Sequence, residues 1–198
     1  MKKFELTTKF ITNVAGKKLF RIKALVEFGN VKAGELGGYV EKEGNISQDG
    51  NAWVSGNAWV AGNATVSGNA WVSGNATVSG NATVSGNAWV TDNTEVSGNA
   101  TVSGNATVSG NAEVSGNAEV SGNTDYALAQ GFGTEFRCTT FYRGKNKKIM
   151  VNCGCFHGDL EEFRKQVKET RSGKIAKEYL MIADLMEYHF VSEDSGDE

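Results

Sequence analysis

The chain has 198 residues and a formal net charge of −3, and it contains 25 glycines but no proline. This length suits one domain with modest additions, and no apolar run reaches the roughly 20 residues that a membrane-spanning helix needs. All 20 Lys and Arg residues lie at or before Lys42 or at or after Arg137, so the middle of the chain lacks the basic groove that a nucleic-acid duplex requires.

Residues 50–121 consist of twelve copies of one six-residue unit, Gly-Asn-Ala-x-Val-Ser. Val fills its position in every copy, whereas the Gly position is broken only at Asp92 and the Ala position only at Thr94. A short fixed period of this kind is typical of a stacked solenoid. Ala and Val are two residues apart, so both point inward from a short strand while x points outward. Gly-Asn tolerates a left-handed backbone and turns the chain.

Read from its Val, the unit becomes Val-Ser-Gly-Asn-Ala-x, which resembles the left-handed parallel β-helix of hexapeptide-repeat proteins. That resemblance implies a mainly β fold in which three units close one 18-residue coil, with about four to five coils over residues 44–124. It also implies a homotrimer, because β-helices of this family often associate in threes. No cofactor is implied.

An 18-residue coil sorts the x residues into three outward columns. The first column is Trp53, Trp71, Trp89, Thr107; the second is Trp59, Thr77, Glu95, Glu113; the third is Thr65, Thr83, Thr101, Glu119. Aromatic ladders pack well in sheets, but an uncovered apolar stripe usually marks a contact surface. We therefore take Trp53, Trp59, Trp71 and Trp89 as candidate partner-binding residues, covered either by the chain's own ends, by a sister subunit or by a foreign partner.

The two ends of the chain do not repeat. Residues 1–43 are expected to form a β-rich cap, with strands at 3–12 and 18–28 and a turn at 13–16, followed by a degenerate repeat at 44–49. A small α+β module is expected over 125–191. In it a hairpin pairs 135–142 with 148–153, a helix is capped by Asp159 and Glu162, and a second helix covers 174–190. Residues 123–134 are expected to be a hinge or last corner, and the acidic residues 192–198 a disordered tail.

The second helix is predicted from five apolar residues at helical spacing: Ile175, Tyr179, Ile182, Leu185 and Met186.

Catalytic chemistry has little support in these residues. No His precedes His157, so the general base of hexapeptide acyltransferases and the three-His zinc site of β-helical carbonic anhydrases have no counterpart. Cys138, Cys153, Cys155 and His157 offer Cys₃His ligands, but a Cys-x-Cys-x-His strand places them in a line, and buried free thiols are the preferred interpretation. Three clustered Cys and no visible signal peptide favour a reducing cytoplasm.

The ends of the chain carry a further resemblance. The segment Leu19–Glu41 and the run Val-Asn-Cys-Gly-Cys-Phe-His-Gly-Asp-Leu-Glu-Glu-Phe at 151–163 resemble the two ends of uncharacterised hexapeptide-repeat proteins of phages and prophages. The resemblance implies a bacterial cytoplasmic setting and no known catalytic residues.

These patterns lead to one expected function and two alternatives. We expect a non-catalytic phage or prophage β-helix protein that engages and antagonises a host defence protein through its Trp face or its terminal modules. One alternative is a sponge for a small anionic or nucleotide signal held at subunit interfaces by Arg143, Lys145, Lys147 and Lys148. The other is a scaffold or virion component whose repeats only set a length.

Overall fold

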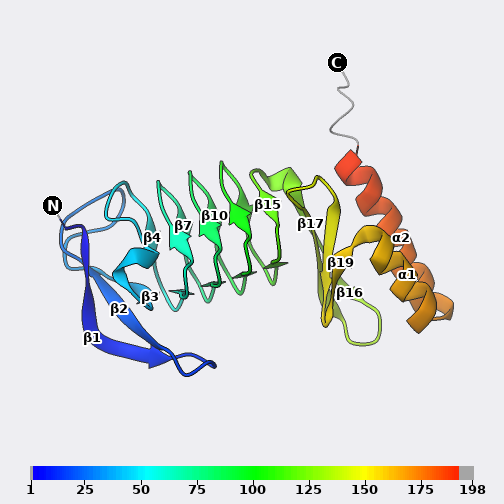
Figure 1. The fold of residues 1–198 in the computed structure, drawn as a ribbon, viewed down its shortest axis with the longest axis horizontal. Helices are drawn as coiled ribbons and strands as arrows, with labels where there is room; N and C mark the ends of the chain where they lie inside the picture. Colours follow the sequence, from blue (N-terminus) through cyan, green and yellow to red (C-terminus); the bar gives the residue numbers. More distant parts are fainter. Residues whose placement is uncertain (1, 192–198) are drawn as a thin grey trace, which may run out of the picture.

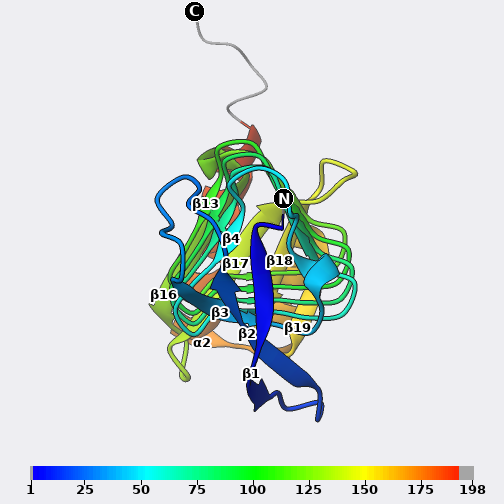
Figure 2. The same cartoon turned by 90° about the vertical axis from the view of Figure 1, so that its left-hand side faces the viewer.

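The computed structural model describes residues 2–191, and these form an elongated molecule with three parts in chain order (Figure 1). A β-hairpin segment lies at one end, a mainly β solenoid of about five turns forms the body, and a sheet with two helices lies at the other end. Seen end-on, the coils stack one behind another (Figure 2). Within the described residues, no helix is both long and apolar enough to cross a membrane.

The solenoid is built from two-residue strands, one per repeat unit, and all of them pair in parallel. The strands are β4 (Trp53–Val54), β5 (Trp59–Val60), β6 (Thr65–Val66), β7 (Trp71–Val72), β8 (Thr77–Val78), β9 (Thr83–Val84), β10 (Trp89–Val90), β11 (Glu95–Val96), β12 (Thr101–Val102), β13 (Thr107–Val108), β14 (Glu113–Val114) and β15 (Glu119–Val120). Trp53 pairs with Trp71, and Trp71 with Trp89, so the 18-residue coil and the three predicted columns are confirmed.

The core of the solenoid is a narrow column of Val and Ala. Every Val of the twelve repeats has no exposed surface, and the Ala residues beside them are buried as well. Burying one Val contributes about 1.5–3 kcal/mol, and this gain is what offsets the ordering of so much Gly-rich chain. Outside the column, Asn side chains form corner ladders in which each amide Nδ2 donates to the Asn Oδ1 18 residues later, as from Asn51 to Asn69 at 3.0 Å.

The hydrogen-bond ladder between coils runs in one direction. The N–H of Trp53 donates to the carbonyl of Ala70 at 3.0 Å, and the N–H of Asn99 donates to the carbonyl of Gly116 at 2.8 Å. Each coil therefore gives its N–H groups to the coil that follows it. As a consequence, the N-terminal end of the solenoid presents carbonyl oxygens that need donors, and the C-terminal end presents N–H groups that need acceptors.

The N-terminal segment provides hydrogen-bond donors for the carbonyl oxygens at the N-terminal end of the solenoid. It contains β1 (Phe4–Thr12), β2 (Lys18–Ala24) and β3 (Leu36–Val40), which join the second column in one sheet of order β1-β2-β3-β5-β8-β11-β14. The predicted strands are present, although the second ends at Ala24 and not at Phe28, and the solenoid pairing already begins at Tyr39, before the expected boundary at 44. On the first face, the buried Lys3 ammonium donates hydrogen bonds to carbonyls of the first coil. On the second face the donors are backbone N–H groups at strand β3, and on the third face the donor is the buried side-chain amide of Asn45, in the short 3₁₀ turn Glu43–Asn45.

The C-terminal module provides hydrogen-bond acceptors for some of the N–H groups at the C-terminal end of the solenoid. Its sheet has the order β16 (Tyr126–Phe132), β17 (Arg137–Arg143), β18 (Ile149–Cys153), β19 (Phe156–Asp159), all antiparallel, and a 3₁₀ turn at Asn123–Asp125 precedes it. Three side-chain oxygens accept from solenoid N–H groups: Asn123 from Thr107 at 2.7 Å, Thr140 from Glu113 at 2.9 Å, and Asp125 from Ser121 at 2.8 Å.

The hinge or last corner expected over residues 123–134 is confirmed only as a corner at the 3₁₀ turn Asn123–Asp125, because Tyr126–Phe132 form the edge strand β16. Only Ala129 of this strand is buried against the helices; Ala127 packs beside it, and Leu128 and residues 130–132 are exposed. The predicted hairpin is confirmed, although β17 starts at Arg137 and the pattern also missed β19.

Two helices cover the face of this sheet that points away from the solenoid (Figure 1). Helix α1 (Leu160–Thr170) begins at the predicted capping box: the Glu162 N–H donates to Asp159 Oδ1 at 3.0 Å, and the Asp159 N–H donates back to Glu162 Oε2 at 2.8 Å. Helix α2 (Gly173–Val191) covers the predicted range. On β17, Phe141 points to the helices and Tyr142 into the solenoid core. The predicted tail at 192–198 lies outside the described residues.

Candidate functional site

The first column carries the stacked tryptophans, but their exposure differs sharply. Trp53 is fully buried, Trp71 is half-buried with its Nε1 donating to Ser55 Oγ at 3.0 Å, and Trp89 is 54% exposed. Phe4 and Phe28 pack edge-on against the Trp53 ring, with centroids 6.3 and 5.4 Å away. Trp53 is therefore removed from the candidate contact surface, because the chain's own N-terminal segment covers it.

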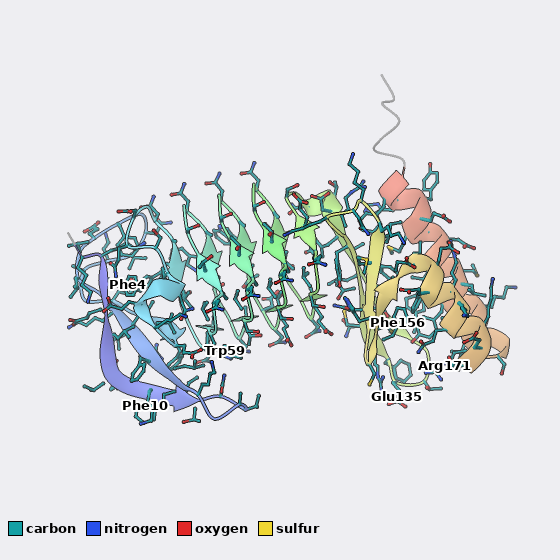
Figure 3. The ribbon with its side chains drawn as sticks, viewed as in Figure 1. Phe4, Phe10, Trp59, Glu135, Phe156 and Arg171 are labelled. Carbon is teal, nitrogen blue, oxygen red and sulfur yellow. The ribbon has the colours of Figure 1, made fainter. Side chains whose placement is uncertain are left out.

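The fourth candidate, Trp59, is half-buried in the second column. It pairs with Tyr39 across β3 and β5, and the Arg21 guanidinium lies 5.0 Å from the centre of the Tyr39 ring while donating to its hydroxyl at 3.0 Å. Figure 3 shows Trp59 on the side of the solenoid from which the β1–β2 hairpin projects, with Phe10 farther out on that hairpin. Of the four tryptophans, Trp89 thus offers the largest free aromatic surface.

Of the four candidate anion-binding residues, Arg143 ends β17, and Lys145, Lys147 and Lys148 lie in the turn between β17 and β18. Two of the four form ion pairs with carboxylates of the same chain. Arg143 forms an ion pair with Asp125 at 3.2 Å and donates to the Phe190 carbonyl at 2.6 Å. Lys148 pairs with Asp159 at 2.7 Å, a bond that raises the pKa of the Lys148 ammonium. Lys145 and Lys147 are exposed in the turn.

The Cys and His residues do not gather into a metal site. Among residues 2–191, no group of three or more His, Cys, Asp or Glu side chains is arranged to hold a metal ion. Cys138 and Cys153 are half-buried and Cys155 is exposed; burial raises the pKa of the Cys138 thiol, and Thr139 donates to Cys153 Sγ at 3.1 Å. His157 instead contacts the amide oxygen of Asn152.

A row of exposed apolar residues in the C-terminal module was not identified from the sequence. Met181, Leu185 and Tyr188 lie at i, i+4 and i+7 on the outer side of α2 and are 61%, 59% and 73% exposed; we call them the α2 stripe. Leu185 is one of the apolar residues whose spacing predicted the helix, but it lies on the outer side, since α2 packs through Ile182, Ala183, Met186 and Phe190. Because α2 is apolar on nearly all sides, periodicity alone did not distinguish its inner from its outer face.

The α2 stripe stands beside an ion-pair network. Arg164 of α1 donates to Asp184 at 2.9 Å and to Glu187 at 2.7 Å, which fixes α2 against α1. A small cavity of about 60 Å³ lies at the other end of the same helix pair, lined among others by Glu135, Phe156, Arg171 and Tyr179. Figure 3 shows Glu135, Phe156 and Arg171 around this end of the module. A space of this size admits water rather than an organic ligand.

Comparison with known families identifies the class of the body alone. The model of the YdcK beta-solenoid repeat matches residues 60–74, 70–86, 76–92 and 96–110. All four segments lie within the solenoid, so the match supports a repeat β-solenoid protein and leaves both ends without a counterpart. No curated protein matches the chain.

Proposed function

We propose that this protein is a non-catalytic binding protein that engages another protein through the α2 stripe of its C-terminal module. The observation that carries the proposal is the exposure of Met181, Leu185 and Tyr188, three large apolar side chains in one row, each more than half exposed. A row with this spacing matches the way in which an amphipathic helix fills an apolar groove of its partner. Isolated exposed apolar residues need no explanation, whereas contiguous ones mark contact surfaces.

The solenoid supports this role as a rigid spacer. Its outward columns contain Thr and Glu apart from the tryptophans, and its inward side chains fill the core. Trp89 is a second candidate contact, lying on the body rather than on the module. The two surfaces are far apart along the molecule (Figure 1), so their contributions can be separated by substitution.

The biological setting of the proposal comes from the resemblance of the chain's ends to phage and prophage hexapeptide-repeat proteins. On that basis the partner is a bacterial host protein, a defence protein in particular, and the setting is the bacterial cytoplasm. The homotrimer is proposed on the separate resemblance of the repeats to left-handed parallel β-helices. A scaffold or virion role is the competing proposal; it predicts that no soluble host protein depends on the α2 stripe.

The test is a pull-down from a bacterial lysate, with captured proteins identified by mass spectrometry and then purified and mixed with the bait. Leu185→Asp is the disabling variant, and Trp89→Ser is the control, because both replace an exposed apolar side chain with a polar one. A partner lost with Leu185→Asp and kept with Trp89→Ser supports the proposal, provided that both variants melt like the wild type. A partner that is kept by Leu185→Asp contradicts it, and light scattering reports whether the stripe instead holds sister subunits.

A further inference from the structure

A cavity of about 310 Å³ lies where the solenoid ends and the C-terminal module begins. One wall is the corner at Gly116 and Asn117, where the Asn ladder that runs through Asn99 ends. Another wall is the β17–β18 turn with Lys145 and Asn146. His157 of β19 closes a third side. The volume is at the lower end of the range for small-molecule sites, which begins at about 300 Å³.

The direction of the hydrogen-bond ladder leaves Asn117 with free donors. Asn99 donates its N–H to the Gly116 carbonyl and its Nδ2 to Asn117 Oδ1, at 2.8 and 3.3 Å, so donors at this corner point toward the next coil. Asn117 is the last member of its ladder, and neither its N–H nor its Nδ2 has an acceptor among the described residues. Asn117 lines the cavity beyond the last coil, so both donors are available to a ligand there.

The turn is held against this corner, which keeps the cavity open in a defined shape. The Lys145 N–H donates to the Asn117 carbonyl at 2.9 Å, and the neighbouring Gly144 forms a bridge with Ala118. The backbone of Lys145 is fixed in this way, and Lys145 is one of the residues that line the cavity. None of the lining residues is acidic, although the Glu113 carboxylate is close enough to His157 to interact with its ring.

The ring of His157 is oriented by Asn152. The Asn152 Nδ2 donates to the Glu113 carbonyl and to Ser115 Oγ, both at 2.9 Å, so its Oδ1 is left to accept from His157 Nδ1. The other ring nitrogen, Nε2, faces the Gly116 corner: a methyl group placed on Gly116 would come within 3.0 Å of it. Nε2 is thus the ring atom available to a ligand.

We propose that this junction cavity binds a small organic oxyanion, a phosphate or carboxylate group, between the Asn117 donors and the Lys145 ammonium. Because His157 Nδ1 carries the proton that Asn152 accepts, Nε2 of the neutral ring holds a lone pair and accepts from a hydroxyl or protonated oxygen of the ligand. Backbone and amide donors that converge with a lysine form charge-assisted hydrogen bonds to such a group. The apolar wall at Met150 leaves room for the rest of the molecule. No residue of the α2 stripe lines the cavity, so the site does not depend on the proposed protein partner.

The test uses the full-length protein with three probes: inorganic phosphate, AMP and succinate. Calorimetry measures their affinity, and proton NMR follows the Hε1 signals of the two histidines, since the chain contains only His157 and His189. We expect at least one probe to bind at concentrations up to about 5 mM, an affinity that corresponds to roughly 3 kcal/mol, and to shift the His157 signal more than that of His189. The ranking of the three probes separates phosphate from carboxylate recognition.

Two matched pairs of variants locate the binding. Asn117→Asp keeps the acceptor for Asn99 but replaces the free Nδ2 donor by a negative charge, and Asn111→Asp does the same at the end of another ladder that does not line the cavity. Lys145→Ala removes the ammonium of a lining residue, whereas Lys147→Ala removes one from a residue of the same turn that does not line the cavity. Asn117→Asp and Lys145→Ala should each weaken binding about tenfold, and the controls less than about twofold. Equal effects of both members of a pair, or no binding by any probe, overturn the proposal.

Discussion

The Nζ of Lys3 donates a hydrogen bond of 2.9 Å to the main-chain carbonyl of Ala52, and it also reaches the Gly50 carbonyl at 3.2 Å. In the middle of the solenoid such carbonyls accept from the N–H groups of the preceding coil. At the first coil there is no preceding strand on this face, so a lysine side chain replaces one. Lys3 is 3% exposed, and its ammonium lies 4.8 Å from the centre of the Phe28 ring. This cap therefore places a positive charge where it is shielded from solvent.

The first prediction follows from that burial. Desolvation, partly offset by Asp49, lowers the pKa of Lys3 from 10.5 to about 8. Between these pH values the unfolded chain holds more protons than the folded one, so the free energy of unfolding rises with pH across this window. The rise contributed by Lys3 is about 1–3 kcal/mol, and Lys3→Met should remove it. Urea denaturation of both proteins at pH 7.5 and pH 10 measures the difference; parallel pH profiles would contradict the assignment.

The second prediction concerns the equivalent cap on the third face. The buried Asn45 donates its Nδ2 to the carbonyls of Gly62 and Ala64, at 3.2 and 2.8 Å, and accepts from the Lys42 N–H at 2.9 Å. Asn45→Ala leaves these groups without partners in the interior, and we expect a loss of about 2–4 kcal/mol in unfolding free energy. Asn81→Ala, within an exposed ladder, is the control and should cost less than about 1 kcal/mol. Similar losses in the two variants would sink the capping argument.

The third prediction separates the structural tryptophan from the surface one. Trp53 is enclosed by Phe4 and Phe28, so Trp53→Ala opens a cavity between the N-terminal segment and the first coil and should cost about 3–5 kcal/mol. Trp89→Ala, in the same column, should cost less than about 1 kcal/mol because more than half of that side chain is in water. Thermal melts followed by circular dichroism compare the two. If Trp89→Ala were the more damaging change, the exposure described for this column could not hold in solution.

The solenoid could be predicted from the sequence because every repeat has the same residue types at the same positions and therefore the same local conformational preferences. Val and Ala, two residues apart, point to the inner face of each strand, and Gly-Asn forms the corner. Identical residues stack from one coil to the next, which fixes the register between coils. A glycine such as Gly86, at φ 66° and with its missing Cβ facing Gly104 at 2.9 Å, has no freedom to be another residue without strain.

The ends could be predicted only in outline, because their contacts join residues far apart in the chain. Nothing near Lys3 in the sequence indicates that its partners are 47 and 49 residues away, at Gly50 and Ala52. The cavity at Asn117 depends likewise on a turn almost thirty residues later, which no local pattern places there. The burial of Trp53 has the same origin, since only the folded N-terminal segment reveals which tryptophan it covers.

The last prediction tests whether each end depends only on the coil next to it. Deleting residues 80–97 removes one 18-residue coil and joins Ser79 to Gly98, which preserves the repeat and leaves the contacts of Lys3, Asn45 and Thr140 unchanged. The shortened protein should therefore fold, with a stability lowered only by the lost coil and its interfaces. Circular dichroism and urea denaturation measure this.

The matched control for that experiment is the deletion of residues 80–88, which joins Ser79 to Trp89 and moves every later Val out of the core column. This shorter deletion should prevent folding, because inward and outward side chains exchange places beyond the junction. If the 18-residue deletion also fails to fold, the ends communicate through the whole solenoid, and the caps are not the local devices that their hydrogen bonds describe. If it folds and still captures the partner that needs Leu185, the number of coils does not determine binding by the α2 stripe.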